Sequence, residues 1–473
     1  MNDRASEAPT GAGRPRPWRL ELVILLLAAS AGLRLYGLDQ GLDYDEIWSA
    51  TQFFTAPWRD LFTHMPLPNH HPLYSLLAKL SLLAFGNKEW AGRLPAFIAG
   101  TLTPVGLYML GSRWLNPRTG LIAGLITAFA LWPVHYSQDA RGYSLVMLLS
   151  IVATGLFLSL MEKFSWGRAS AYAVAGSLLL YTHLYGGAVV GAHGLLALGR
   201  LGRKEDRAQG LRLVAAVGAS LALAFLFYLP LLPDLSGYAR SVGRQTAGRE
   251  LSLGFVGELA LRWSAGETHP YRGLPFLAVA AAGVVRLWRR CWPLAGTLLL
   301  SLGIGVLAPA ALHTFVYHRF YAFALPWFYL AAAAAADGAL TRWPWPGPAR
   351  YLFYGLLAAA AVLPGLDLPG YYRTGKQGWR PAAEWVQANA LQYRVLVAGM
   401  AGEVFDYYCP RAQAVERGAE LAPEDLRRTV VVYSYPGTVG ENNLRRLESS
   451  CPPPARFPAF GDPNSDVYVY RCE

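Results

Sequence analysis

The sequence has few charged residues for its length. Only 15% of its 473 residues are Asp, Glu, Lys or Arg, and 53% are hydrophobic, whereas an ordinary soluble domain has about 25% charged residues. This shortage of charge argues against a soluble protein and favours one whose solvent is lipid. Apolar stretches long enough to cross a bilayer recur from Leu20 to Leu368 and stop after Pro369.

Cysteine is also scarce. The chain has four cysteines, and their spacing does not match a metal site. We expect Cys291 to stay reduced, because it lies beside two arginines at an inner helix end. Cys409, Cys451 and Cys472 follow the last apolar stretch, and Cys451 with Cys472 is the pair that we prefer for a disulfide.

Acidic residues are too few in the hydrophobic part to balance its basic ones. Residues 371–473 contain twelve Lys and Arg and twelve Asp and Glu, so the net charge of +11 lies entirely in the rest of the chain. Basic residues between hydrophobic stretches usually mark cytoplasmic loops that face anionic headgroups. We therefore expect membrane lipids, and no nucleic acid, as partners of these basic residues.

Eleven stretches are candidate membrane-spanning helices. They cover residues 20–38, 90–112, 119–135, 143–161, 169–182, 184–199, 211–232, 273–288, 293–312, 320–336 and 350–368. The first has basic residues before it and no cleavage site, which predicts a cytoplasmic N-terminus. Residues 73–85 are too short and contain Lys79, so we interpret them as a juxtamembrane or re-entrant helix on the outer face.

The expected fold is an α-helical polytopic membrane protein of about eleven helices with a small C-terminal α/β domain. Residues 1–369 form the membrane domain, with long outer loops at 39–89 and 233–272, and residues 370–473 form the extracytoplasmic domain. We expect this multi-pass protein in the cell (inner) membrane. Within 370–473 we expect helices at 380–390 and 441–449, and strands at 395–398, 430–433 and 467–470.

The first outer loop begins with a group of carboxylates. Asp43 and Glu46 have the spacing of a helix capping box, and the apolar residues of 47–54 form a helix face that we expect to lie on the membrane. Asp45 has no role in such a cap. Its carboxylate could act as a base or bind a cation.

Two histidines precede a proline later in the same loop. Pro72 favours a helix start, which would place His70 and His71 at the mouth of that helix. Neutral imidazoles could bind a metal, and protonated ones could bind phosphate. Adjacent residues point in different directions, so we do not expect a metal site made by this pair alone.

Several arginines lie at the expected outer boundary. Arg93, Arg141 and Arg319 each fit a side chain that anchors a helix at the headgroups. Together in one cavity they would instead suit bidentate binding of phosphate. The second outer loop is also basic and ends with His269 and Arg272, which runs against the usual charge bias and indicates an anionic ligand.

Taken together, these motifs resemble those of the polyprenyl-phosphate-dependent glycosyltransferases of the GT-C fold, in the branch of protein O-mannosyltransferases and bacterial aminoarabinose transferases. Each motif is weak alone, but their order and spacing are specific. The matching segments are Asp45-Glu46, His70 to Tyr74, Arg93 to Pro95, Gln138 to Tyr143, and Arg319-Phe320.

The resemblance implies inverting transfer of a sugar from a polyprenyl-phosphate donor, of the undecaprenyl or dolichyl type. The acceptor would be a hydroxyl of a cell-envelope glycan, lipid or protein at the outer face. By similarity, Asp45 is the general base and Glu46 supports it. The phosphate would be bound by His71, Arg141, Arg272 and Arg319, and the substrate by Tyr74, Arg93, Tyr143 and His183.

The chemistry that the resemblance implies needs no nucleotide, and it establishes no cofactor. Some relatives hold a divalent metal between an acid and a histidine. The corresponding positions here are His70 and His269, so a metal at this pair stays open.

Three other functions are compatible with the composition. A transporter or flippase of a lipid-linked or anionic substrate usually has mid-membrane polar residues and repeated halves; here the polar groups gather at one face and no repeat is evident. The second is a GT-C enzyme of another branch that modifies an envelope glycan. The third is an inactive scaffold that binds a partner through its C-terminal domain.

Overall fold

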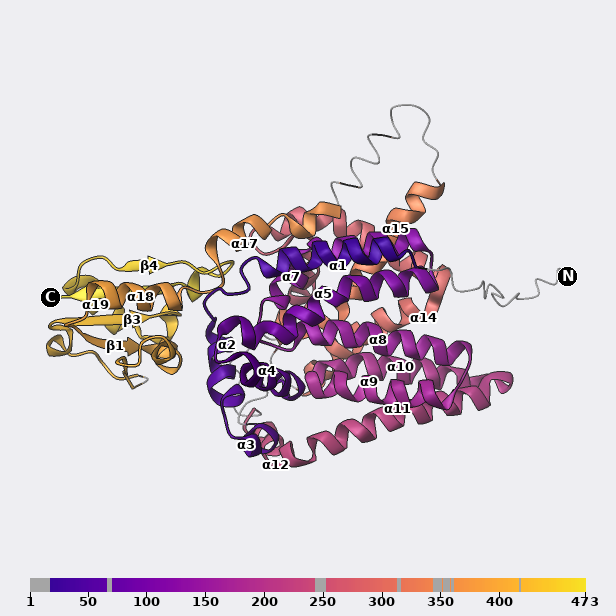
Figure 1. Cartoon of the computed structure of the whole chain (residues 1–473), viewed down its shortest axis with the longest axis horizontal. Coiled ribbons are helices and arrows are strands. Elements are labelled where there is room, and N and C mark those ends of the chain that lie inside the picture. Colours follow the sequence, from indigo (N-terminus) through magenta and orange to yellow (C-terminus); the bar gives the residue numbers. More distant parts are fainter. Residues whose placement is uncertain are drawn as a thin grey trace.

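The computed structural model describes residues 18–65, 70–242, 252–312, 316–342, 351, 358, 361–416 and 418–473. A bundle of long helices and a small sheet domain lie next to each other along the long axis of the molecule (Figure 1). The bundle consists of α1 (Leu20–Leu35), α5 (Glu89–Trp114), α6 (Pro117–Phe129), α7 (Leu131–Ser137), α8 (Tyr143–Glu162), α9 (Trp166–Thr182), α10 (Gly187–Gly199), α11 (Arg207–Tyr228), α14 (Leu274–Leu312) and α15 (Leu325–Arg342).

The bundle is that of a multi-span membrane protein. Six helices of the described chain are long and apolar enough to cross a membrane, and α6 with α7, bent by 60°, would make a seventh. The predicted number of eleven is not confirmed, since α1 and α9 have 16 and 17 residues. α14 joins two predicted spans across a kink at Cys291, and most of the span predicted at 350–368 lies outside the described residues.

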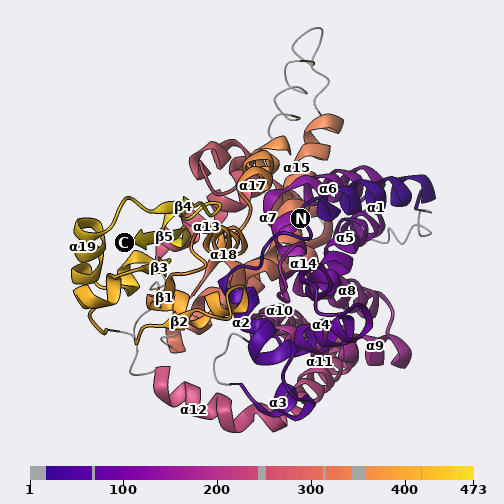
Figure 2. The same ribbon diagram turned by 60° about the vertical axis from the view of Figure 1, so that its left-hand side comes forward.

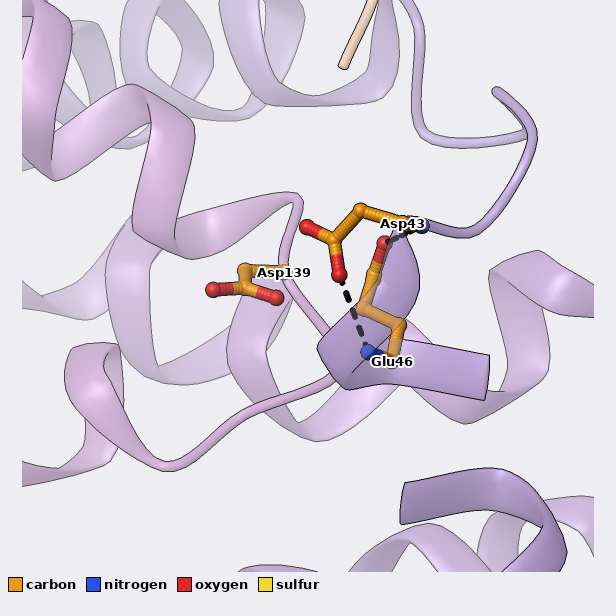
Figure 3. A group of neighbouring side chains, drawn as sticks. All are labelled: Asp43, Glu46 and Asp139. Carbon is orange, nitrogen blue, oxygen red and sulfur yellow. Dashed lines mark hydrogen bonds between the residues drawn. The ribbon is translucent and has the colours of Figure 1, made fainter. Parts of the chain in front are cut away.

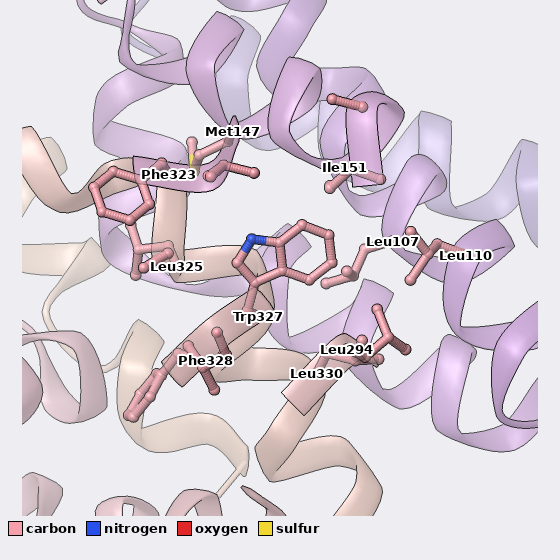
Figure 4. Packing of buried hydrophobic residues seen from close by; sticks show 14 of the residues in the cluster. Leu107, Leu110, Met147, Ile151, Leu294, Phe323, Leu325, Trp327, Phe328 and Leu330 are labelled. Atoms are coloured by element: carbon pink, nitrogen blue, oxygen red, sulfur yellow. The ribbon is translucent and has the colours of Figure 1, made fainter. Parts of the chain in front are cut away.

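The centre of the bundle is an apolar core around Trp327 of α15. This side chain packs among apolar residues of α5, α8, α14 and α15 and of the 3-10 segment before α15 (Figure 4). Its indole nitrogen donates a hydrogen bond to Ser150 Oγ at 3.0 Å, which satisfies the polar group of a ring that is 1% exposed. α14 approaches α15 closely at Gly283, where a Cβ would lie 1.8 Å from the Ala331 carbonyl oxygen.

Short helices cover one end of the bundle. They are α2 (Tyr44–Ser49), a π-helical turn at Ala50–Phe54, α3 (Trp58–Thr63), α4 (Pro72–Phe85), α12 (Leu232–Val242) and α13 (Leu253–Ala265). α4 agrees with the short helix predicted at 73–85, and its place relative to the membrane stays a prediction.

The predicted membrane contact of residues 47–54 is wrong. Ile47, Phe53 and Phe54 are at most 2% exposed, and they pack in one cluster with Tyr74 and Ala78 of α4. The predicted apolar face is present. Periodicity does not say what covers such a face, and here protein covers it.

The C-terminal domain contains a five-stranded mixed sheet in the order β2-β1-β3-β5-β4. β1 is parallel to β2 and β3, whereas β5 is antiparallel to β3 and β4. Its elements are α17 (Leu368–Thr374), α18 (Trp379–Asn389), β1 (Arg394–Ala398), β2 (Gln413–Ala414), β3 (Thr429–Tyr433), α19 (Glu441–Ser450), β4 (Ala455–Phe457) and β5 (Val467–Cys472). The three predicted strands, the two predicted helices and the Cys451–Cys472 disulfide are confirmed.

The sheet domain docks on the end of the bundle where α2 lies, as two views show (Figures 1 and 2). The Leu42 N–H donates to Tyr408 Oη at 2.8 Å, and the Tyr44 N–H donates to Gln377 Oε1 at 2.9 Å. Arg380 of α18 forms an ion pair with Glu89 at the start of α5. The sheet domain therefore contacts the loop that carries the predicted catalytic residues, and also the start of α5.

Candidate active site

Asp43 and Glu46 fix the first turn of α2. Asp43 Oδ1 accepts the Glu46 N–H at 2.9 Å, and Glu46 Oε2 accepts the Asp43 N–H at 3.0 Å. This is the predicted capping box, which is confirmed. Asp45 lies between these two residues and takes no part in the cap.

Asp45 forms an ion pair with Arg319. One Asp45 carboxylate oxygen lies 2.8 Å from the Arg319 guanidinium, although the two residues are far apart in the sequence. Their side chains are 21% and 35% exposed, so a ligand can reach the pair. Arg319 belongs to the 3-10 helix His318–Ala324, which leads into α15. Its guanidinium lies over the Tyr317 ring, 4.6 Å from the ring centroid. A carboxylate and a guanidinium thus face the same accessible space.

Arg141 lies behind this pair and is buried. Its guanidinium donates to Ser49 Oγ at 2.9 Å and lies 3.1 Å from His71 Nε2. His71 is held in turn, because its Nδ1 accepts the Gly142 N–H at 3.0 Å. A Cβ on residue 142 would lie 2.6 Å from this nitrogen, so the close approach requires glycine.

The histidines of the site are neutral near pH 7. Burial, followed by the charge of Arg141, lowers the pKa of His71, and the same causes lower the pKa of His70 and His183 to about 3. Phosphate binding by His71 stays a prediction, in which a neutral imidazole would take part through an N–H instead of a charge. His71 packs 4.8 Å from the His183 ring and 5.0 Å from the Tyr143 ring, so these predicted residues do gather beside Arg141.

Glu46 and Arg93 form a fully buried ion pair. Arg93 Nε and Nη2 lie 2.6 Å and 2.5 Å from the two Glu46 oxygens, and the Ala140 N–H donates to Glu46 at 2.6 Å. Burial alone would raise the pKa of Glu46, but the charges of Arg93 and Lys376 outweigh it and hold the pKa well below its usual value. Glu46 is therefore a permanent carboxylate beneath α2.

Two predicted substrate-binding residues do not line the exposed part of the site. The Arg93 side chain has no exposed surface and donates further hydrogen bonds to carbonyl groups of the 38–41 segment. Tyr74 is 1% exposed, and its hydroxyl donates to the Gly92 carbonyl at 2.8 Å. Arg93 therefore supports the loop that carries Asp45, and Tyr74 ties α4 to α5.

Sequence reasoning missed Lys376. Its ammonium lies 3.1 Å from Glu46, 3.2 Å from Asp139 and 3.5 Å from Asp43, and the side chain is 2% exposed. Figure 3 shows the three carboxylates gathered between α2 and the segment that carries Asp139. The only local signal is a lysine beside a glycine, just after the last apolar stretch.

No contact among the described residues joins His70 to His269. His70 is 2% exposed and stacks on Phe53 at a ring distance of 3.8 Å, whereas His269 lies just before the 3-10 helix Pro270–Gly273. The metal at this pair stays a prediction. Phosphate binding by Arg272 also stays a prediction, and no ion pair of the described chain links Arg272 to Asp45. Lys376 lies within the three-carboxylate group, whose spacing suits a metal.

Comparison with known proteins agrees with this architecture. Residues 69–228 match the family model of dolichyl-phosphate-mannose-protein mannosyltransferases, while no curated protein sequence matches the chain. ArnT from Cupriavidus metallidurans in the apo state covers 95% of this chain over 98% of its own length, with a TM-score of 0.62 and 15% identity. ArnT bound to undecaprenyl phosphate covers 96% of this chain over 98% of its own length, with a TM-score of 0.62 and 16% identity.

A more distant match is the Archaeoglobus fulgidus oligosaccharyltransferase in complex with zinc and sulfate. It covers 95% of this chain over 73% of its own length, with a TM-score of 0.51 and 13% identity. The chain thus has the GT-C glycosyltransferase fold. Its predicted resemblance to ArnT, in fold, and to the dolichyl-phosphate-mannose-protein mannosyltransferases, over residues 69–228, is confirmed.

Proposed function

We propose that this protein is a membrane glycosyltransferase that moves a sugar from a polyprenyl-phosphate donor to an acceptor hydroxyl. The observation that carries the proposal is the accessible Asp45–Arg319 pair, with a 2.8 Å separation, beside the buried Arg141. The match to ArnT bound to undecaprenyl phosphate supports the donor class. The acceptor would belong to a cell-envelope glycan, lipid or protein.

In the proposed reaction Asp45 takes the proton of the acceptor hydroxyl as the oxygen attacks the anomeric carbon. The bond from that carbon to the phosphate oxygen breaks, and the polyprenyl phosphate leaves with the electron pair. Attack from the face opposite the phosphate inverts the anomeric configuration. Arg319 and Arg141 stabilise the charge on the departing phosphate.

The Asp45–Arg319 contact suggests how binding prepares the base. Without donor, Arg319 neutralises the carboxylate that has to accept the proton. A donor phosphate competes for the same guanidinium and offers bidentate oxygens. Donor binding then draws Arg319 from Asp45, and the carboxylate becomes a stronger base when the donor is in place.

We place the reaction at the outer face of the cell membrane, with a cytoplasmic N-terminus and the sheet domain outside. Polar residues of the site lie at the end of the bundle that contacts the sheet domain. A transporter would be expected to place them near mid-bundle. This arrangement therefore supports transfer at one face over transport through the bundle.

The test uses the purified full chain in lipid nanodiscs with a panel of labelled polyprenyl-phosphate sugars and candidate acceptors. Asp45→Asn should lower kcat by about 10²–10⁴-fold, the usual contribution of a general base, with donor binding retained. Asp60→Asn, in the neighbouring helix α3, is the matched control and should keep full turnover. NMR of the product should show inversion.

Each part of the proposal can fail separately. Full turnover in the Asp45→Asn protein would exclude this base, and a product of retained configuration would exclude single displacement. If the wild-type protein transferred no sugar from any donor of the panel, the proposed function would be refuted.

A further inference from the structure

The three carboxylates of Asp43, Glu46 and Asp139 are arranged like the ligands of a bound cation. One oxygen from each lies within 4.8 Å of the other two (Figure 3). The Lys376 ammonium lies 3.1–3.5 Å from all three groups. These are distances of an ammonium paired with carboxylates, whereas calcium contacts its oxygen ligands at about 2.3–2.6 Å.

The charges of this cluster require the lysine. Glu46 is neutralised by Arg93, which leaves Asp43 and Asp139 to share Lys376. Removing one member of a buried ion pair leaves an uncompensated charge, which is strongly destabilising. Within the described chain, Lys376 is the cation in contact with both of these remaining carboxylates.

The lysine contacts both sides of the candidate active site. Asp43 and Glu46 flank Asp45 in the first turn of α2, and Asp139 precedes Arg141 by two residues. The Arg141 N–H donates to the Asp139 carbonyl at 2.6 Å. A single ammonium thus ties the segment of the proposed base to the segment of the proposed phosphate ligand.

The segment that carries the lysine is itself clamped. Gly375 has φ +77, a conformation that favours glycine, and it turns the chain from α17 toward the site. The residue after Lys376, Gln377, accepts the Tyr44 N–H at 2.9 Å and donates to the Ser465 carbonyl at 2.9 Å. Gln377 thus links this segment both to α2 and to the sheet domain.

We propose that Lys376 is a positioning residue of the active site, a tethered cation that fixes the Asp45 and Arg141 segments relative to each other. It enters with the segment that leads into the sheet domain, so docking of that domain completes the site. The catalytic part of this inference rests on the proposed function. Its structural part does not.

The experiment compares Lys376→Ala with wild type in the same nanodisc assay. Misplacement of a catalytic group by about 1 Å can cost about 100-fold in rate, so we expect a loss of kcat of about that size. The donor KM should change little, because Arg141 and Arg319 remain. Added n-propylammonium, which replaces the missing side-chain amine, should restore turnover in a saturable way and raise the Tm.

Manganese provides a second probe of the vacated site. By electron paramagnetic resonance, Lys376→Ala should bind one Mn²⁺ more than wild type, and Lys376→Ala combined with Asp139→Asn should lose this additional ion. Arg380→Ala is the matched control, since Arg380 docks the same domain on Glu89. Neither n-propylammonium nor Mn²⁺ should change the turnover or the Tm of that control.

Wild-type turnover in Lys376→Ala would overturn the proposal. So would a loss of turnover and Tm that n-propylammonium does not reverse, because Lys376 would then serve docking alone. If wild type transfers no sugar at all, the proposed function fails, and the Tm and Mn²⁺ measurements decide the structural part by themselves.

Discussion

Replacing Glu46 by Gln keeps the shape of the side chain but removes its charge from a position without exposed surface. The two carboxylate oxygens accept from Arg93 Nε and Nη2, from the Ala140 N–H and from the Asp43 N–H. An amide supplies one acceptor oxygen, and its NH2 group would face donors. Leaving Arg93 without its counter-charge should destabilise the protein by about 3–5 kcal/mol.

A double-mutant cycle separates this pair from its surroundings. Arg93→Met alone should lower the free energy of unfolding by a similar amount. The loss in the double variant should be smaller than the sum of the two single losses by about 1–3 kcal/mol. Unfolding would be followed by tryptophan fluorescence during SDS titration in mixed micelles. Glu89→Gln, which removes a partly exposed pair with Arg380, is the control and should cost about 1 kcal/mol or less. Additive losses for Glu46 and Arg93 would refute the reasoning.

Two further predictions concern stability. Because burial lowers the pKa of His183 to about 3 from 6.5, the unfolded chain binds a proton there that the folded protein does not. The free energy of unfolding should therefore fall as pH drops below 6.5, by up to about 1.4 kcal/mol per pH unit, and His183→Phe should remove this component. The prediction would be contradicted if the free energies of unfolding of His183→Phe and wild type differed by the same amount at about pH 7.5 and about pH 5. Separately, Cys451→Ser opens a loop spanning 21 residues and should cost about 3 kcal/mol. Calorimetry should show a smaller effect for the buried free thiol of Cys409 when it is replaced by Ser, and equal effects would argue against a stabilising disulfide.

The features that the sequence predicts well are those encoded within a few residues. The Asp43–Glu46 capping box, the strands at β1, β3 and β5 and the two amphipathic helices each follow from local spacing, and all are present. β2 and β4 have two and three residues, too few to show a periodic pattern. The number of spans is harder, because α14 continues through what the sequence presents as a loop.

The site shows the same division between local and long-range information. Motif order predicts that Asp45 and Arg319 belong to one site, and the structure places their charged groups 2.8 Å apart. The contacts of Lys376 cannot be read from sequence spacing, since its three partners come from two distant segments. The protonation state of His71 depends on burial, which only the folded protein determines.

The position of Lys376 in the chain also affects how the protein is made. About 330 residues separate Glu46 from this lysine, and ribosomes add roughly 5–20 residues per second. The acidic cluster therefore waits some tens of seconds for its last cation while the intervening helices are being inserted. During biosynthesis the nascent enzyme acquires its final internal charge balance only after most of its membrane helices have been synthesised, which delays completion of the site until the C-terminal part emerges.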